Sequence, residues 1–129
     1  MQKLKAMIVE DSVLMRRAVI KTLNRAEVAD FDFTEAADGL EALKKLSEGK
    51  FDILFVDWNM SRMTGIDLVR AIRGKEKEAT EEARMTIVMV TSERQPSKIK
   101  EALEDAGADV YITKPFSVQD FKDKVAPLL

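Results

Sequence analysis

The stretch "FDILFVDWNMSRMTG", residues 51 to 65, decides the fold because an apolar run leads directly into an acid. Residues 53 to 56 are all apolar, which is typical of a parallel strand that is covered on both faces. The run stops at Asp57. Thr64, followed three residues later by Asp67, then marks the start of a helix. The stretch therefore predicts a strand, a loop that begins with a carboxylate, and a helix.

Strand-like runs alternate with amphipathic helical segments along the rest of the chain. The predicted strands are residues 5 to 9, 32 to 36, 51 to 56, 86 to 91 and 109 to 113. Capping residues mark further helix starts at Asp38 and Ser117, and Pro96 suits the first turn of the fourth helix. Gly107 suits the end of that helix. This fivefold alternation predicts an α/β fold, a doubly wound parallel sheet with right-handed crossovers.

The composition fits one domain that spans residues 1 to 129, with 46% hydrophobic and 34% charged residues. The chain has 21 basic and 23 acidic residues, so its formal net charge is -2. This charge gives no sign of a basic surface that would bind nucleic acid or an anionic membrane. The absence of cysteine and histidine excludes disulfides, thiolate metal sites, imidazole bases and a phosphohistidine on this chain. No apolar run reaches the roughly 20 residues of a membrane span, so we expect a cytoplasmic protein.

Polar residues follow the predicted strands at the positions where such sheets bind their ligands, at the carboxyl ends. These residues are Glu10, Asp11, Asp57, Thr91, Ser92 and Lys114. Clustered carboxylates repel one another unless a cation compensates them, and Mg²⁺ suits a few oxygen ligands. Asp57 could then attack a phosphoryl group whose oxygens Lys114 and Thr91 stabilise. Each residue alone also fits a turn, a cap or a solvated surface; their joint placement favours a site.

Motifs along nearly the whole chain resemble the receiver domain of two-component response regulators, most of all the stand-alone chemotaxis type. The matching stretches are "IVEDS" (8 to 12), "MRRAV" (15 to 19), "EAADGLEAL" (35 to 43), "DWNM" (57 to 60), "MVTSE" (89 to 93) and "YITKPF" (111 to 116). The resemblance implies the flavodoxin-like strand order 2-1-3-4-5.

The resemblance also implies which residues handle the phosphoryl group. Asp57 resembles the phosphorylated aspartate, and Lys114 resembles the lysine that neutralises the phosphoryl group and precedes a cis peptide bond with Pro115. The implied cofactor is Mg²⁺, for which Mn²⁺ could substitute. The implied metal site comprises the side chains of Glu10, Asp11 and Asp57 and the backbone carbonyl of Asn59.

Further residues resemble the family's switch and the neighbours that set the phosphoryl lifetime. Thr91 resembles the switch hydroxyl, and Tyr111 resembles the aromatic residue that turns inward with it. Asn59 and Glu93 match positions that influence hydrolysis in the chemotaxis type. One departure is Ser61, which stands where the family usually has proline and which loosens the loop after Asp57.

The resemblance implies partners as well. A histidine kinase would donate the phosphoryl group, and the fourth helix, fifth strand and fifth helix would bind an output protein. A flagellar motor switch component or a phosphatase fits the chemotaxis type. We expect a monomer that is not an enzyme beyond its own phosphorylation and dephosphorylation, and that binds neither nucleic acid nor membrane.

Other interpretations remain open at this stage. A receiver cut from a larger regulator, for example a transcriptional one, would have the same sequence, although Pro127 and the chain end at Leu129 favour independence. An aspartate-nucleophile phosphatase would usually carry a second acid where Asn59 stands. A flavin-binding domain would need a hydroxyl- and glycine-rich first loop, whereas "EDSVLM" supplies two acids.

Overall fold

The strands form one parallel sheet in the computed structural model of the chain, which describes residues 1–79 and 84–129. The strands are β1 (Lys3–Val9), β2 (Asp30–Ala36), β3 (Ile53–Val56), β4 (Thr86–Thr91) and β5 (Val110–Thr113). Their order is β2-β1-β3-β4-β5, and every neighbouring pair is parallel. The predicted α/β fold and its strand order are therefore confirmed.

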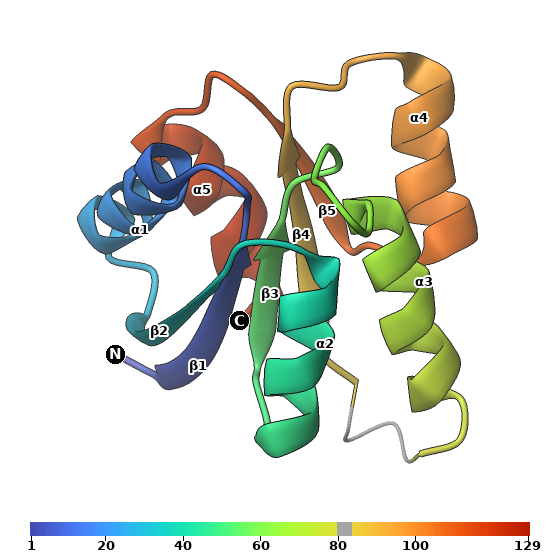
Figure 1. Cartoon of the computed structure of the whole chain (residues 1–129). Coiled ribbons are helices and arrows are strands. Elements are labelled where there is room, and N and C mark those ends of the chain that lie inside the picture. Colours follow the sequence, from blue (N-terminus) through green and yellow to red (C-terminus); the bar gives the residue numbers. More distant parts are fainter. Residues whose placement is uncertain (80–83) are drawn as a thin grey trace.

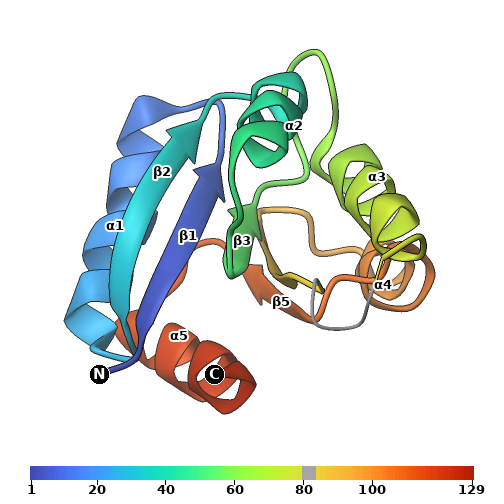
Figure 2. The same cartoon turned by 90° about the horizontal axis from the view of Figure 1, so that it is seen from below.

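Helices cover both faces of this sheet. They are α1 (Val13–Ala26), α2 (Gly39–Glu48), α3 (Gly65–Glu76), α4 (Pro96–Lys100) and α5 (Val118–Val125), with a π-helical segment η2 (Glu101–Ala106) and a short 3-10 turn η3 (Ala126–Leu128). Helices α1 and α5 lie on one face, and α2, α3 and α4 lie on the other (Figures 1 and 2). No helix in residues 1–79 or 84–129 is long and apolar enough to cross a membrane.

The predicted helix starts are confirmed by their capping bonds. The side chains of Asp38 and Thr64 accept hydrogen bonds from backbone N–H groups in the first turns of α2 and α3. Ser117 and Asp120 form a reciprocal capping box at the start of α5. Pro96 lies in the first turn of α4, where its missing N–H costs nothing. Local sequence therefore decides where these helices begin.

The fourth helix differs from the expected regular helix between Pro96 and Gly107. After Lys100 it continues as η2, where the N–H of Gly107 donates to the carbonyl of Ala102 at 3.1 Å. Gly107 has φ +99°, a left-handed conformation that glycine adopts without a steric penalty and that ends the helix. The spacing of apolar residues does not reveal such a local widening of the helix.

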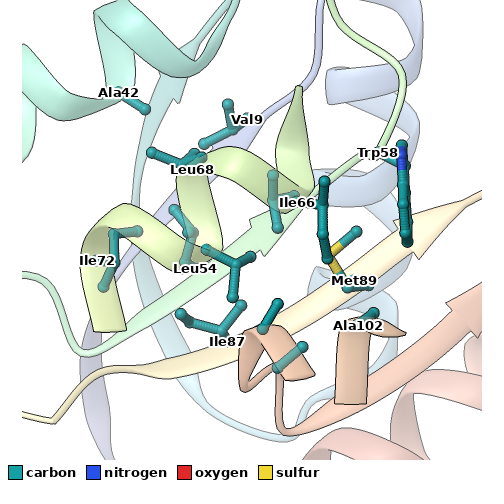
Figure 3. Close-up of a cluster of buried hydrophobic side chains, with 14 of the residues drawn as sticks. Val9, Ala42, Leu54, Trp58, Ile66, Leu68, Ile72, Ile87, Met89 and Ala102 are labelled. Atoms are coloured by element: carbon teal, nitrogen blue, oxygen red, sulfur yellow. The ribbon is translucent and has the colours of Figure 1, made fainter. Parts of the chain in front are cut away.

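The core consists of two layers, one on each face of the sheet. Residues of β3 alternate between them, so that Leu54 and Val56 face α2 and α3 whereas Ile53 and Phe55 face α1 and α5. All four are at most 1% exposed. Figure 3 shows Leu54 between Leu68, Ile72 and Ile87 in the first layer. Burial on both faces explains the uninterrupted apolar run that the sequence shows here.

Several predicted strand bounds were wrong by one or two residues. Strand β1 begins at Lys3 instead of residue 5, and β2 begins at Asp30 instead of residue 32, because their exposed charged ends pair in register. Strand β3 begins at residue 53 and β5 at residue 110, later than predicted. The Asp109 carboxylate instead binds Arg73, Arg84 and the N–H of Ile87. Polar ends carry no apolar signal that a sequence pattern could detect.

Candidate functional site

Backbone hydrogen bonds continue past the strands and fix the polar residues that follow them. The N–H of Glu10 donates to Ala36 on β2 at 3.1 Å, and the N–H of Asp57 donates to Val9 on β1 at 3.0 Å. The N–H of Lys114 donates to Thr91 on β4 at 2.9 Å. Three predicted site residues are thus positioned by the sheet itself.

The ammonium group of Lys114 lies between two carboxylates. Its Nζ is 2.8 Å from Oε2 of Glu10 and 3.5 Å from Oδ2 of Asp57. The three side chains are only 15%, 7% and 9% exposed, so their charges are weakly screened by water. The Lys114–Pro115 peptide bond is cis, as the resemblance implied. The structure therefore unites the ends of β1, β3 and β5 in one small charged centre.

Burial changes the acidity of this centre. Burial raises the pKa of Glu10 to about 7. The charge of Asp57 also raises this pKa, whereas the hydrogen bond from Lys114 lowers it. A carboxyl group with this pKa carries its proton for much of the time near neutral pH. An added cation would favour its ionised form.

The donor atoms of the centre fit a hard cation. Among the described residues, Oδ1 of Asp57 is the buried side-chain oxygen that has no hydrogen-bond partner. Glu10, Asp57, the exposed Asp11 and the carbonyl of Asn59 would supply only oxygen, which is what Mg²⁺ prefers. Within the described ranges, no group of three acidic side chains lies close enough together to hold a metal ion, so a bound ion would also need the Asn59 carbonyl or water as ligands. Lys114 supplies the positive charge between Glu10 and Asp57.

The predicted switch residues are linked through Glu93. Thr91 is fully buried, and its hydroxyl accepts a hydrogen bond from the N–H of Glu93 at 3.3 Å. The Tyr111 hydroxyl donates to the carbonyl of Glu93 at 2.8 Å. Tyr111 is 6% exposed, and burial raises its pKa to about 12. The tyrosine therefore points inward in this structure, and one residue contacts both members of the predicted pair.

Asn59 and Glu93, the two residues predicted to influence the phosphoryl lifetime, contact each other at the protein surface. Nδ2 of Asn59 donates to Oε1 of Glu93 at 3.3 Å. Beside them, the ammonium of Lys98 lies 4.8 Å from the ring centre of Trp58, which is 6% exposed. This cation–π contact joins α4 to the loop that carries Asp57.

Two site-supporting arginines were not predicted. Arg16 donates from Nη1 to the carbonyl of Glu10 at 2.6 Å and pairs through Nε with Glu35 at 2.9 Å. Arg62 pairs with the buried carboxylate of Asp38. In the sequence Arg16 lies off the apolar stripe of its helix and Arg62 lies in a loop, so both look like solvated surface charges. Their partners lie 6 to 24 residues away in the sequence, so these contacts become visible only in the structure.

Comparisons with known proteins identify the family to which this chain belongs. The model of the response regulator receiver domain matches residues 6–126. The chemotaxis protein CheY of Pseudomonas aeruginosa is 44% identical over 125 residues, which are 95% of this chain and 93% of that protein. The chemotaxis protein CheY-3 of Vibrio cholerae is 40% identical over 124 residues, with 96% and 90% coverage.

Solved structures show the same fold. The chemotaxis protein CheY4 of Vibrio cholerae superposes with a TM-score of 0.81 at 32% identity, over 98% of this chain and 99% of that one. The response regulator TrrA of Thermotoga maritima, solved in complex with Mg(2+)-BeF, has a TM-score of 0.77 at 27% identity over the full length of both chains. The two relatives at 44% and 40% identity are chemotaxis proteins, and the chain belongs to the response regulator receiver domain family of two-component systems.

Proposed function

We propose that this chain is a phosphorylation-controlled signalling protein that accepts a phosphoryl group on Asp57 from a histidine kinase. The arrangement of Asp57 and Lys114 supports this proposal. One carboxylate oxygen of Asp57 faces the Lys114 ammonium at 3.5 Å, and the other has no hydrogen-bond partner among the described residues. A nucleophilic oxygen needs such freedom, since a strong hydrogen bond would reduce its reactivity.

The transfer would use the side chains as follows. A carboxylate oxygen of Asp57 forms a bond to phosphorus while the bond from phosphorus to the donor's imidazole nitrogen breaks, and the electron pair stays on that nitrogen. Lys114 neutralises the charge on the phosphoryl oxygens, and the Thr91 hydroxyl donates a hydrogen bond to one of them. Bound Mg²⁺, or Mn²⁺ in its place, would further neutralise this charge. Its proposed ligands are Glu10, Asp11, Asp57 and the Asn59 carbonyl.

Glu93 would couple phosphorylation of Asp57 to a change at the protein surface, because it is hydrogen-bonded to both Thr91 and Tyr111. Movement of Thr91 toward a phosphoryl group would break its bond with the Glu93 N–H, and the same residue holds the Tyr111 hydroxyl through its carbonyl. Phosphorylation would thus change the balance between two packings of β5 and α4. We infer that the face formed by α4, β5 and α5 binds the output protein in only one of them.

The output that we propose is chemotaxis, because two relatives that match 95% and 96% of this chain are chemotaxis proteins. The partner would be a component of a flagellar motor switch, with a phosphatase as the antagonist. We further propose that the chain acts in the cytoplasm as a monomer. It would catalyse only its own phosphorylation and dephosphorylation, because Asn59 replaces the second acid that an aspartate-nucleophile phosphatase uses.

Intact mass after incubation with Mg²⁺ and acetyl phosphate tests this function. We expect one added phosphoryl group, which is lost in Asp57→Asn and in the presence of a chelator. Asp32→Asn is the matched control, because it makes the same change at an exposed position on β2. Stoichiometric uptake by Asp57→Asn would refute the assignment. Trp58 fluorescence, recorded in parallel, reports whether Mg²⁺ binds next to the acceptor.

A further inference from the structure

The loop between β3 and α3 contains a strained turn. Arg62 has φ +67°, which is uncommon for a residue with a long side chain. The N–H of Met63 donates to the carbonyl of Ser61 at 2.8 Å and closes a three-residue turn about Arg62. Such a conformation persists only when surrounding contacts hold it. The same loop carries Asp57 and Asn59 at its other end.

Contacts with the first turn of α2 hold this turn in place. Nε and Nη2 of Arg62 lie 2.8 Å and 2.7 Å from Oδ2 of Asp38. The Asp38 side chain is 8% exposed, whereas that of Arg62 is 60% exposed. Met63 packs on Gly39 so closely that a Cβ at this glycine would lie 2.7 Å from the Met63 Cγ. An ion pair and a close packing contact therefore fasten the loop to α2.

Asp38 is a fixed, ionised anchor. Its Oδ1 accepts the N–H of Glu41 at 2.9 Å, which caps α2, and its Oδ2 accepts Arg62. The hydrogen bond from the Glu41 backbone, followed by the Arg62 guanidinium, holds the pKa of Asp38 below its usual value. If the loop moved, the Asp38 carboxylate could not move with it without losing the hydrogen bond that caps α2. The ion pair therefore forms only when the loop places Arg62 next to Asp38.

We propose that the Arg62–Asp38 ion pair positions the loop from Asp57 to Thr64 and thereby sets the Mg²⁺ affinity and the phosphoryl lifetime of the site. At Ser61 the loop lacks the proline ring that would restrict its backbone. The Arg62–Asp38 ion pair would restrict the loop instead, by holding it against α2. Arg62 is a positioning residue, because it acts through the backbone between Asn59 and Met63. The inference about affinity and lifetime rests on the proposed function; the inference about loop motion does not.

Paired variants test the proposal. Arg62→Gln removes the guanidinium, and Asp38→Asn removes the charge but keeps an oxygen that can cap α2. Arg70→Gln is the matched control, because it breaks the ion pair between Arg70 and Glu101 on exposed helical surface. The measurements are amide hydrogen exchange of residues 59 to 64 without metal, Mg²⁺ titration by Trp58 fluorescence, and decay of the phosphorylated protein.

We expect Arg62→Gln and Asp38→Asn each to speed loop exchange and to weaken Mg²⁺ binding roughly twofold to fivefold, within the range of an ion pair with one exposed partner. The double variant should lose no more than either single one, because the two residues act as a pair. Arg62→Lys should recover part of the loss. Loop exchange in Arg62→Gln equal to that in Arg70→Gln would overturn the proposal. If the wild type took up no phosphoryl group, the proposed function would fail while the exchange experiment still decided the positioning role.

Discussion

Replacing Gly65 by alanine is expected to displace the backbone of Asp57, the predicted phosphoacceptor. Gly65 is the first residue of α3, and its N–H donates to the carbonyl of Trp58 at 2.8 Å. A Cβ at this position would lie 1.9 Å from the carbonyl oxygen of Asp57 and 2.8 Å from its carbonyl carbon. The start of the helix thus packs directly on the backbone of the predicted phosphoacceptor.

The size of the effect follows from these distances. The Cβ and the Asp57 oxygen would have to separate from 1.9 Å to at least 3.0 Å, and both sides of the contact are backbone, so no side chain can rotate away. Overpacking of this kind costs about 1–3 kcal/mol, and a backbone clash belongs at the upper end. A displacement of about 1 Å at a reacting group can slow a reaction on the order of a hundredfold.

Urea unfolding and phosphoryl uptake measure the two consequences. Gly74→Ala is the control, because it makes the same change in the same helix where an added Cβ meets nothing within 4 Å. We expect Gly74→Ala to stabilise the fold by up to about 1 kcal/mol, through the better helix propensity of alanine. Gly65→Ala should lower both the free energy of unfolding and the rate of uptake from acetyl phosphate. Equal unfolding free energies for the two variants, or unchanged uptake in Gly65→Ala, would refute this account of the contact.

Further predictions concern the acid, the cap and the tyrosine. Without metal, the free energy of unfolding should fall as pH rises from 4.5 to about 7, because folded Glu10 keeps a proton that the unfolded chain has lost. Glu10→Gln should reduce this slope, and an unchanged slope would contradict the raised pKa. Ser117→Ala should cost about 1 kcal/mol in urea unfolding by removing the cap of α5, whereas Ser97→Ala, at a position without a capping bond, should cost less. Tyr111→Phe should cost about 1 kcal/mol, since it removes the hydrogen bond to Glu93; a stability equal to that of the wild type would show that this bond contributes nothing.

Much of the fold could be predicted because its signals are local. The apolar run from Ile53 to Val56 marks a strand buried on both faces, and Asp38, Thr64 and Ser117 mark helix starts through bonds within one turn. The convergence of Glu10, Asp57 and Lys114 also follows from the pattern, because parallel strands end at the same edge of the sheet. Alternation and capping are thus enough to place these side chains near one another.

Other features could not be predicted because they depend on distant neighbours. Arg62 and Asp38 are 24 residues apart, and nothing in either local sequence shows that they meet. The close approach of Gly65 to Asp57 depends on the angle at which α3 leaves the loop. The π-helical segment after Lys100 depends on the packing of α4, which amphipathic spacing does not resolve. Each of these features is set by tertiary packing, and the first two act directly on the loop of the candidate site.

The sheet holds the charged centre but not the predicted switch contacts around Glu93. Glu10, Asp57 and Lys114 each donate a backbone hydrogen bond to a neighbouring strand, so the sheet holds the backbone at the charged centre. The Thr91 hydroxyl and the Tyr111 hydroxyl instead meet at Glu93, beyond the end of β4, where the backbone is no longer part of the sheet. A new charge on Asp57 would therefore leave the acceptor in place and act on the contacts around Glu93. In the proposed function, a held centre beside a less constrained loop would convert phosphorylation of Asp57 into a change of the protein surface.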